Sequence, residues 1–297
     1  MSESRWLAEQ FEENRGHLRG VAYRMLGSLS EADDAVQESW LRLSRSDADV
    51  IENLRGWLTT VVARVCLDML RSRKSRREEP LETAAPEHVN KAVNPSDPET
   101  EAVLADSVGF ATLVVLDRLN PAERIAFVLH DLFDVAFEEI ARITGRSPEA
   151  ARQLASRARR RVRGVTTLPE GELAQQRSLV EKFLTAMRLG DSTKLLEVLD
   201  PAFAVHADAT ASPGGVPIEI HGAEASAKQA IQAARGARFA RPAMVDGSVG
   251  LIVAPRGRLF RVLQFTFANG RIAALEVIGN PERLRSIEVG VVDERGG

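Results

Sequence analysis

The sequence has few of the features that mark secreted, membrane-spanning or metal-binding proteins. Its 297 residues include a single cysteine, Cys66, which excludes a disulfide framework and a cysteine-based zinc site. No stretch reaches the roughly 20 apolar residues of a membrane span. The N-terminus has no apolar segment of the kind found in signal peptides. We therefore expect a cytoplasmic protein with no membrane partner, no metal and no cofactor.

Charge is unevenly distributed along the chain. Residues 1–77 carry 13 Lys/Arg and 12 Asp/Glu, residues 78–101 carry one Lys and seven acids, and residues 102–169 carry ten Arg and eight acids. Two short stretches concentrate the positive charge. Arg71 to Arg77 holds five cations and no acid, and Arg146 to Arg163 holds seven arginines and one acid. Such stripes are typical of a surface that follows a phosphate backbone, although solvated helix ends also carry them.

The length and the proline pattern predict three folded pieces. At about 150 residues per domain, the chain favours two domains or three small ones. Four prolines and seven acids make residues 78–101 a linker. A glycine- and threonine-containing stretch after the arginine-rich run marks a second boundary. We expect domains at residues 5–77, 102–165 and 172–297.

The first piece has helical periodicity throughout. The pattern predicts a helix that ends near Gly27, a second at Glu31–Leu43 with Ser30 as N-cap, and a third from about Leu54 to Arg73. The second piece should hold four helical segments, one of which starts at Asn120-Pro121. The expected buried residues of the first piece are Leu7, Phe11, Leu18, Val21, Ala22, Met25, Ala32, Val36, Trp40, Leu43, Leu58, Val61, Val62, Val65 and Met69.

The third piece mixes helical and strand patterns. Hairpin turn signals occur at Asp246-Gly247 and Asn269-Gly270. Together the patterns predict an α+β domain in which helices cover a curved antiparallel sheet. The expected helices are Leu173–Leu189, Asp191–Leu199 and Ala223–Ala234, and the expected strands lie within Phe203–His206, Ile218–His221, Ala243–Val253, Leu259–Ala268 and Arg271–Ile278.

The strongest local signal is a helix-turn-helix between Phe137 and Arg163. A short helix beginning at Phe137 precedes Gly145, which suits a tight turn, and Ser147-Pro148 can cap and start a second helix. We expect Ala150, Leu154, Ala158 and Val162 to face the core. The outward side would then present polar and basic groups to a DNA major groove: Glu149, Arg152, Gln153, Ser156, Arg157 and Arg160.

Two strings in the first piece change the reading of this motif. They are Asp33-Asp34-Ala35-Val36-Gln37-Glu38 and Arg55-Gly56-Trp57-Leu58. In order and spacing, these strings and the helix-turn-helix resemble a bacterial extracytoplasmic-function (group IV) sigma factor. Residues 5–77 resemble its region 2 and residues 102–163 its region 4. The resemblance implies a protein that brings core RNA polymerase to chosen promoters by recognising their −10 and −35 elements.

The resemblance also assigns partners to three sets of residues. One set matches the segment that docks on the clamp of the polymerase β′ subunit: Asp33, Asp34, Val36, Gln37, Glu38 and Leu41. A second matches the part that captures the −10 element and holds the adjacent duplex: Asn53, Arg55, Trp57, Arg71, Arg73, Lys74, Arg76 and Arg77. A third matches the −35 reading helix: Ser147, Glu149, Arg152, Gln153, Ser156, Arg157 and Arg160.

Alternatives remain open for some of these residues. Trp57 can belong to the core, and Asp33 and Asp34 can simply favour a helix N-terminus. In the resemblance, region 4 also binds the β flap, and the acidic linker follows the polymerase channels used by RNA. A plain solvated tether would have the same composition as that linker.

The third piece resembles the SnoaL-like branch of the NTF2-like cone, as found in extended sigma factors of the ECF41 (SigJ-like) type. Asn280-Pro281-Glu282-Arg283-Leu284 resembles a short motif near the end of such chains. The expected fold is therefore two all-α sigma domains plus a C-terminal α+β NTF2-like (SnoaL-like) cone. The resemblance implies that this domain regulates the sigma regions in cis, and a small apolar ligand in it is possible.

Two other classes of function stay open at this point. His206, Asp208 and His221 could supply acid–base chemistry in a cone-shaped enzyme fused to a DNA-binding domain. A one-component, ligand-sensing transcription regulator would also combine a helix-turn-helix with a pocket, and it would bind DNA without polymerase. We expect a non-enzymatic sigma factor in preference to both.

Overall fold

The structure is a computed structural model that describes residues 3–46, 51–78, 110–212, 214–232, 234–255 and 258–292. The chain divides into two compact units. Unit 1 comprises Met1–Gly109 and Leu116–Arg159, and unit 2 comprises Phe110–Val115 and Arg160–Gly297. The linker expected at residues 78–101 lies outside the described residues apart from its first residue, so its path stays a prediction. No helix in the described ranges is long and apolar enough to cross a bilayer.

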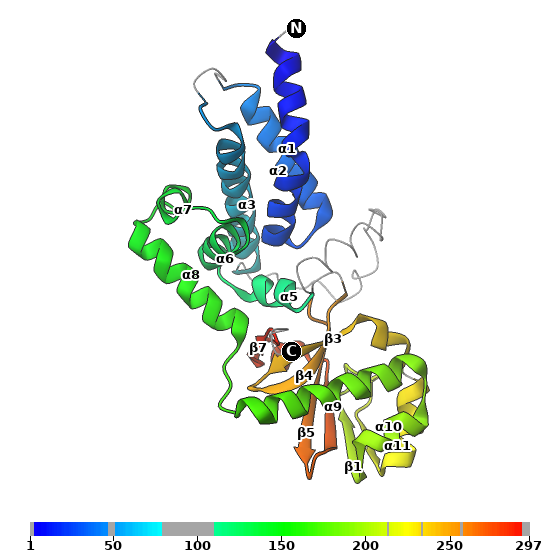
Figure 1. The fold of residues 1–297 in the computed structure, drawn as a ribbon. Helices are drawn as coiled ribbons and strands as arrows, with labels where there is room; N and C mark the ends of the chain where they lie inside the picture. The colour runs from blue at the N-terminus through cyan, green and yellow to red at the C-terminus, as the bar shows by residue number, and fades with distance from the viewer. Residues whose placement is uncertain are drawn as a thin grey trace. The chain divides into compact units, whose positions relative to one another are not determined.

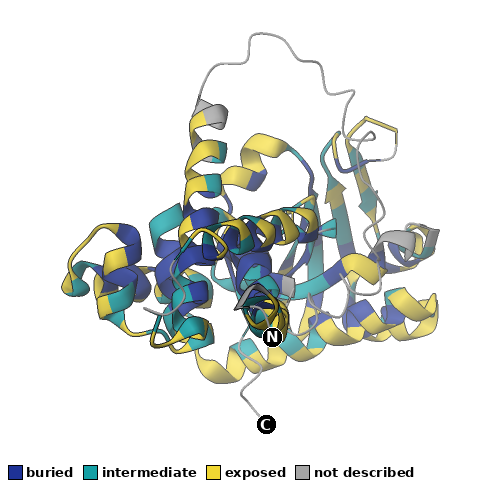
Figure 2. Ribbon diagram, turned by 90° about the horizontal axis from the view of Figure 1, so that it is seen from above, coloured by how far each residue is buried: buried dark blue, intermediate teal, exposed yellow. Residues whose placement is uncertain are grey.

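Unit 1 begins with three helices that pack against one another and form its first core (Figure 1). They are α1 (Glu3–Leu26), α2 (Leu29–Leu43) and α3 (Leu54–Glu78). Their buried residues follow helical spacing, and Figure 2 shows the buried residues gathered in the interior of the helical part and the exposed ones around it. Gly27 follows α1 with φ of 70°, a left-handed conformation that glycine adopts without strain. The three expected helices are confirmed.

Four details of these helices differ from expectation. The N-cap of α2 is Ser28, and Ser30 lies inside the helix. The helix starts earlier because Leu29 is itself buried and extends the apolar stripe toward the N-terminus. Leu7, Trp40 and Met69 are only half-buried. The other expected core residues of the three helices are buried.

The rest of unit 1 is helical and contains the predicted helix-turn-helix. Asn120 caps α6 by accepting a hydrogen bond from the Glu123 backbone N–H at 2.9 Å, with Pro121 at the first helical position, as expected. A π-helical turn follows α6 directly, a feature that 3.6-residue periodicity does not predict. The elements are α5 (Phe110–Arg118), which unit 1 shares with unit 2, α6 (Pro121–Phe127), η3 (Val128–Leu132), α7 (Phe137–Thr144) and α8 (Pro148–Arg163).

The turn between α7 and α8 forms as predicted. Gly145 adopts φ of 70°, and the Ser147 hydroxyl accepts a hydrogen bond from the Ala150 backbone N–H at 3.2 Å. One prediction about α8 is wrong, because Ala150 and Val162 are only half-buried. A strict four-residue step drifts around a helix of 3.6 residues per turn, so the buried stripe alternates steps of three, one and three. The buried residues of α8 are Ala151, Leu154, Ala155 and Ala158.

Unit 2 is built on one seven-stranded sheet in the order β2-β1-β6-β5-β4-β3-β7. The two predicted hairpin turns are present, with positive φ at Asp246, Gly247, Asn269 and Gly270. The strands are β1 (Leu199–Ala207), β2 (Ile218–His221), β3 (Ala240–Val245), β4 (Ser248–Val253), β5 (Arg261–Ala268), β6 (Arg271–Ile278) and β7 (Val289–Gly290).

The sheet is mixed, which corrects the expected antiparallel arrangement. β1 pairs with β6 in parallel, while all the other neighbouring strands are antiparallel. Turn signals specify only strands that are joined by a hairpin. β1 and β6 are far apart in the sequence, with β2, α11, η4, β3, β4 and β5 between them, so no local signal reports their direction.

The sheet has a hydrophobic cluster on each face. On one face, α9 (Glu170–Leu189), α10 (Ser192–Val198) and α11 (Ala223–Gln232) cover Phe203, Phe265 and Leu275. Figure 1 shows α9 crossing the strands. On the other face, Val245, Ile252 and other strand residues pack against α12 (Pro281–Ser286) and against residues 111–115 of α5. A short 3-10 segment, η4 (Ala234–Phe239), leads into β3. Part of the second predicted domain therefore belongs to the core of the third.

Candidate polymerase and promoter interfaces

Most of the α2 residues assigned to polymerase binding lie on one exposed stripe. Asp33, Gln37 and Leu41 are spaced four residues apart and exposed, and Asp34 lies beside them. Asp33 accepts a hydrogen bond from Arg19 Nε at 2.7 Å, and Glu38 forms an ion pair with Arg42 at 2.9 Å. Because α2 starts at Leu29, Asp33 and Asp34 lie beyond its first turn, where the helix dipole has little effect.

Val36 does not share this stripe. Its side chain is 1% exposed and packs in the core of unit 1. Val36 therefore packs α2 onto the rest of unit 1. Leu41, which is 40% exposed, is the apolar side chain of the stripe that a partner can contact.

The start of α3 holds the residues assigned to −10 capture. Asn53 caps the helix, since its side-chain oxygen accepts a hydrogen bond from the Gly56 N–H at 2.9 Å. Arg55 is exposed, and its Nη2 lies 3.1 Å from Nδ1 of His17 in α1. Trp57 is half-buried, so part of its ring is accessible. The sequence did not reveal the contact between Arg55 and His17.

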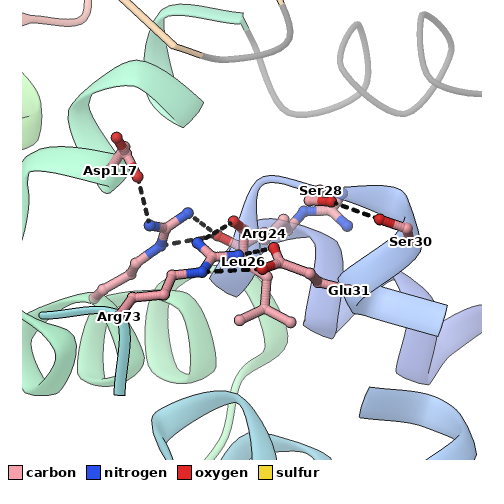
Figure 3. Close-up of polar contacts among 8 residues, drawn as sticks. Arg24, Leu26, Ser28, Ser30, Glu31, Arg73 and Asp117 are labelled. Carbon is pink, nitrogen blue, oxygen red and sulfur yellow. Dashed lines mark hydrogen bonds and ion pairs between the residues drawn. The ribbon is translucent and has the colours of Figure 1, made fainter. Parts of the chain in front are cut away.

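The basic end of α3 is less uniformly exposed than its composition suggests. Arg71 is exposed. Arg73 is half-buried, forms an ion pair with Glu31 and donates from Nη1 to the Leu26 carbonyl at 3.1 Å (Figure 3). Arg73 thereby binds the C-terminal end of α1, where carbonyls lack helical partners. The side chains of Lys74, Arg76 and Arg77 lie outside the described part of the structure.

The outward face of α8 carries every residue assigned to −35 reading. All six of its outward residues are exposed, as is the capping Ser147. Arg152 faces Glu138 at 3.7 Å and lies over the Phe137 ring at 5.4 Å, which connects α8 to α7. Arg157 lies 3.3 Å from the buried Glu123 of α6. Two of the arginines therefore also hold α8 in place, whereas Gln153, Ser156 and Arg160 are exposed along its outward face.

The start of α8 has a fixed negative charge. Hydrogen bonds from its own backbone N–H and from the Ser147 hydroxyl lower the pKa of Glu149, and Arg152 adds a smaller effect. The carboxylate is therefore ionised at neutral pH and can only accept hydrogen bonds. An acceptor at the first turn of a reading helix suits the amino group of a cytosine.

A buried arginine that the sequence did not reveal organises the centre of unit 1. Arg124 of α6 is 2% exposed. Its Nη2 and Nε lie 3.3 and 3.4 Å from the Arg24 carbonyl at the end of α1, and its Nη1 lies 3.5 Å from Asp117. Burial lowers the pKa of Arg124 to about 10, an effect that Asp117 partly offsets, so it is a cation at neutral pH. Figure 3 shows Asp117, Arg24 and Arg73 around this point.

Further side-chain contacts join distant segments of unit 1. The Thr60 hydroxyl of α3 donates to Glu139 of α7. Phe133, which follows η3, meets the His17 ring edge-on at 5.3 Å and lies 5.2 Å from the Arg24 guanidinium. Within unit 1, the helices of the first piece therefore pack against α6, η3 and α7.

Of the residues weighed for catalysis in unit 2, His206 and His221 share one neighbour, and Asp208 lies in a separate environment. His206 and His221 are exposed and lie 3.9 and 2.9 Å from the exposed Glu219. Asp208 has a different environment, because its carboxylate accepts hydrogen bonds from the backbone N–H groups of Ala211, Gly279 and Asn280, each at 2.8 Å. Across the described ranges, no cluster of three or more His, Cys, Asp or Glu has metal-binding geometry.

Asp208 positions the Asn280-Pro281 motif, and its charge should stabilise unit 2. Burial opposes ionisation, but the backbone hydrogen bonds outweigh it and lower the pKa of Asp208. We expect Asp208→Ala to reduce the free energy of unfolding of unit 2 by roughly 2 kcal/mol at pH 7. A depressed carboxyl pKa stabilises the fold above its unfolded value of about 3.9 and loses that effect as pH falls through the folded value. Thermal unfolding followed by circular dichroism at pH 7 and pH 3 tests this.

The control for that experiment is Asp200→Ala. Asp200 accepts one local backbone hydrogen bond, from Ala202 N–H at 2.8 Å. Its substitution should have a smaller effect. A wild-type advantage over Asp208→Ala that is as large at pH 3 as at pH 7 would contradict the assigned role.

Comparison with known proteins agrees with this geometry. Residues 10–76 match Sigma-70 region 2, and residues 111–162 match Sigma-70, region 4. The chain is 38% identical over 290 residues to the ECF RNA polymerase sigma factor SigJ of Mycobacterium tuberculosis (strain H37Rv), with 92% of each chain covered. The crystal structure of the M. tuberculosis SigJ aligns at 34% identity over 93% of this chain and 98% of that one, with a TM-score of 0.46. An NTF2-like protein from Cytophaga hutchinsonii, 17% identical, aligns over 37% of this chain and 93% of its own, with a TM-score of 0.26.

A helical bundle and a helix-turn-helix that match two sigma-70 regions in order define a promoter-recognition subunit of RNA polymerase. The chain belongs to the ECF RNA polymerase sigma factor family and is of the SigJ type. It carries two helical sigma domains and a C-terminal domain in which helices cover a mixed sheet. A one-component regulator is not favoured by these findings.

Proposed function

We propose that the exposed stripe of α2 binds the clamp of the polymerase β′ subunit, that the start of α3 captures the −10 element, and that the outward face of α8 reads −35. Region 4 would bind the β flap as well. The observation that carries this proposal is the exposure of Asp33, Asp34, Gln37 and Leu41 on one side of a helix whose other side is buried. The protein would act in the cytoplasm, without catalytic activity or a cofactor of its own. A small apolar ligand for the C-terminal domain stays a prediction.

The C-terminal domain would regulate region 4 through shared helices. Ala111, Val114 and Val115 of α5 are buried in the core of unit 2. At the end of α8, Val162 packs against the same core, and its carbonyl accepts a hydrogen bond from the Val291 N–H at 2.6 Å. The start of α5, the first helix of region 4, and the end of α8, its last helix, therefore both belong to the core of the C-terminal domain. A change in that domain would act directly on the −35 reading helix.

Charge reversal on the α2 stripe tests the polymerase contact. Asp34→Arg should weaken binding to core RNA polymerase by at least about tenfold, because a like charge would face the basic clamp. Promoter-dependent run-off transcription should fall in parallel. The control is Glu13→Arg, the same charge change at an exposed position of α1. Equal core binding by the two variants would refute the assigned surface, and no promoter-specific transcript from the wild type would refute the promoter function.

A further inference from the structure

The C-terminal domain has an exposed cluster of phenylalanines and arginines that plays no part in the function above. Phe239 and Phe260 are 39% and 52% exposed. Each ring has an arginine above it, with the Arg238 guanidinium 4.5 Å from the Phe239 centroid and the Arg261 guanidinium 4.9 Å from that of Phe260. An exposed aromatic ring beside a cation offers a partner both a stacking surface and a positive charge.

Sheet pairing brings the two rings to the same end of the sheet. Val253 of β4 pairs with Ala240 of β3 on one side and with Arg261 of β5 on the other. The phenylalanines immediately precede those two partners in the sequence. Neighbouring strands lie about 4.8 Å apart, so the backbones that carry the rings are about 10 Å apart. That spacing fits two bases of one extended strand.

More cations gather at this end of the domain. Arg188 of α9 donates to the Ala240 carbonyl at 2.9 Å, and repulsion by Arg241 adds to burial in lowering the Arg188 pKa. Arg258 is exposed. No carboxylate pairs with Arg238, Arg258 or Arg261 among the described residues.

The sequence around the cluster contains almost no acid. Between Ala225 and Leu275 there are eight Lys or Arg and one acid, Asp246. Asp246 lies in the turn at the far end of β3, about 17 Å along the strand from the cluster. This stretch therefore carries eight cations against one acid, although the whole chain has a net charge of −3.

We propose that the surface formed by Arg238, Phe239, Arg258, Phe260 and Arg261 binds single-stranded nucleic acid. Arginines attract the phosphates, and the two exposed rings stack on bases, the combination found in proteins that bind single strands. An acidic peptide would satisfy the charges but leave the rings exposed to water. A duplex offers phosphates but keeps the faces of its bases covered. This binding site would be additional to the −10 and −35 contacts.

Binding of a fluorescein-labelled dT15 oligonucleotide to the full-length protein, followed by fluorescence anisotropy, tests the proposal. The double variant Phe239→Ala/Phe260→Ala should bind at least tenfold more weakly, since one stacked base is worth about five- to 150-fold in affinity. Arg238→Ala/Arg258→Ala should make the salt dependence shallower by about 1.4 in log K against log salt, at about 0.7 for each lost phosphate contact. The matched control is Lys182→Ala/Arg285→Ala, which removes two exposed cations elsewhere in unit 2.

Photo-crosslinking identifies the occupant. A benzoylphenylalanine at position 260 should form an adduct with the oligonucleotide. An adduct only with residues 78–101 of the same chain would overturn the proposal and assign the surface to the acidic linker. Equal affinities for the wild type and the phenylalanine variant, at equal melting temperatures, would also overturn it. The assay needs neither polymerase nor a promoter, so this site and the proposed sigma contacts can fail separately.

Discussion

Replacing Arg124 with methionine should lower the free energy of unfolding of unit 1 by about 3 kcal/mol. Methionine fills much of the same volume but donates no hydrogen bond. The Arg24 carbonyl would then be left without its donor from α6, and Asp117 would lose its cation. A buried group that loses a charged partner suffers the full desolvation penalty, whereas a surface pair loses little.

The three tryptophans of the chain make this prediction measurable. Trp6, Trp40 and Trp57 all lie in unit 1, so tryptophan fluorescence during urea denaturation reports that unit alone. The control is Arg142→Met, the same substitution at an exposed position of α7, which should change stability by less than about 0.5 kcal/mol. Equal midpoints for the two variants would show that Arg124 does not hold α6 to the end of α1.

Local sequence signals predicted the local structure well. Asp246-Gly247 and Asn269-Gly270 form the expected turns, because positive φ depends on the residues themselves. Gly145, with its positive φ, and Ser147, whose hydroxyl caps α8, likewise bound the turn between α7 and α8. The comparisons confirm the family that the ordered motifs indicated.

Features that join distant parts of the chain were not predicted. Arg124 reads as an ordinary helix residue until the fold places it beside the end of α1. Arg73, predicted as a DNA contact, is engaged by Glu31, 42 residues earlier. Phe239 and Phe260 come to the same end of the sheet only because the residues that follow them, Ala240 and Arg261, pair with Val253 of β4. The acid-free stretch around them was visible in the sequence, but composition alone does not show which of its cations share a surface.

We expect the largest loss of stability from a mutation at the boundary between region 4 and the C-terminal domain. The domain boundary predicted from the sequence assigns all of α5 to region 4. In the structure, however, Val114 is 1% exposed and packs in the core of unit 2. Val114→Asp should destabilise that unit by more than about 4 kcal/mol, because it buries a carboxylate among aliphatic side chains without a partner. Hydrogen exchange in β3 and β4, which line this core, should rise by several orders of magnitude.

The same substitution on an exposed valine separates burial from charge. Val165, two residues beyond the end of α8, is 65% exposed, so Val165→Asp should leave exchange in β3 and β4 unchanged. If Val114→Asp behaves like Val165→Asp, α5 is not part of the C-terminal core. If Val114→Asp raises hydrogen exchange in β3 and β4 as expected, the first helix of region 4 and the C-terminal domain fold together. The proposed regulation in cis then needs no separate docking surface, because α8, whose outward face is proposed to read −35, already ends in the core of the C-terminal domain.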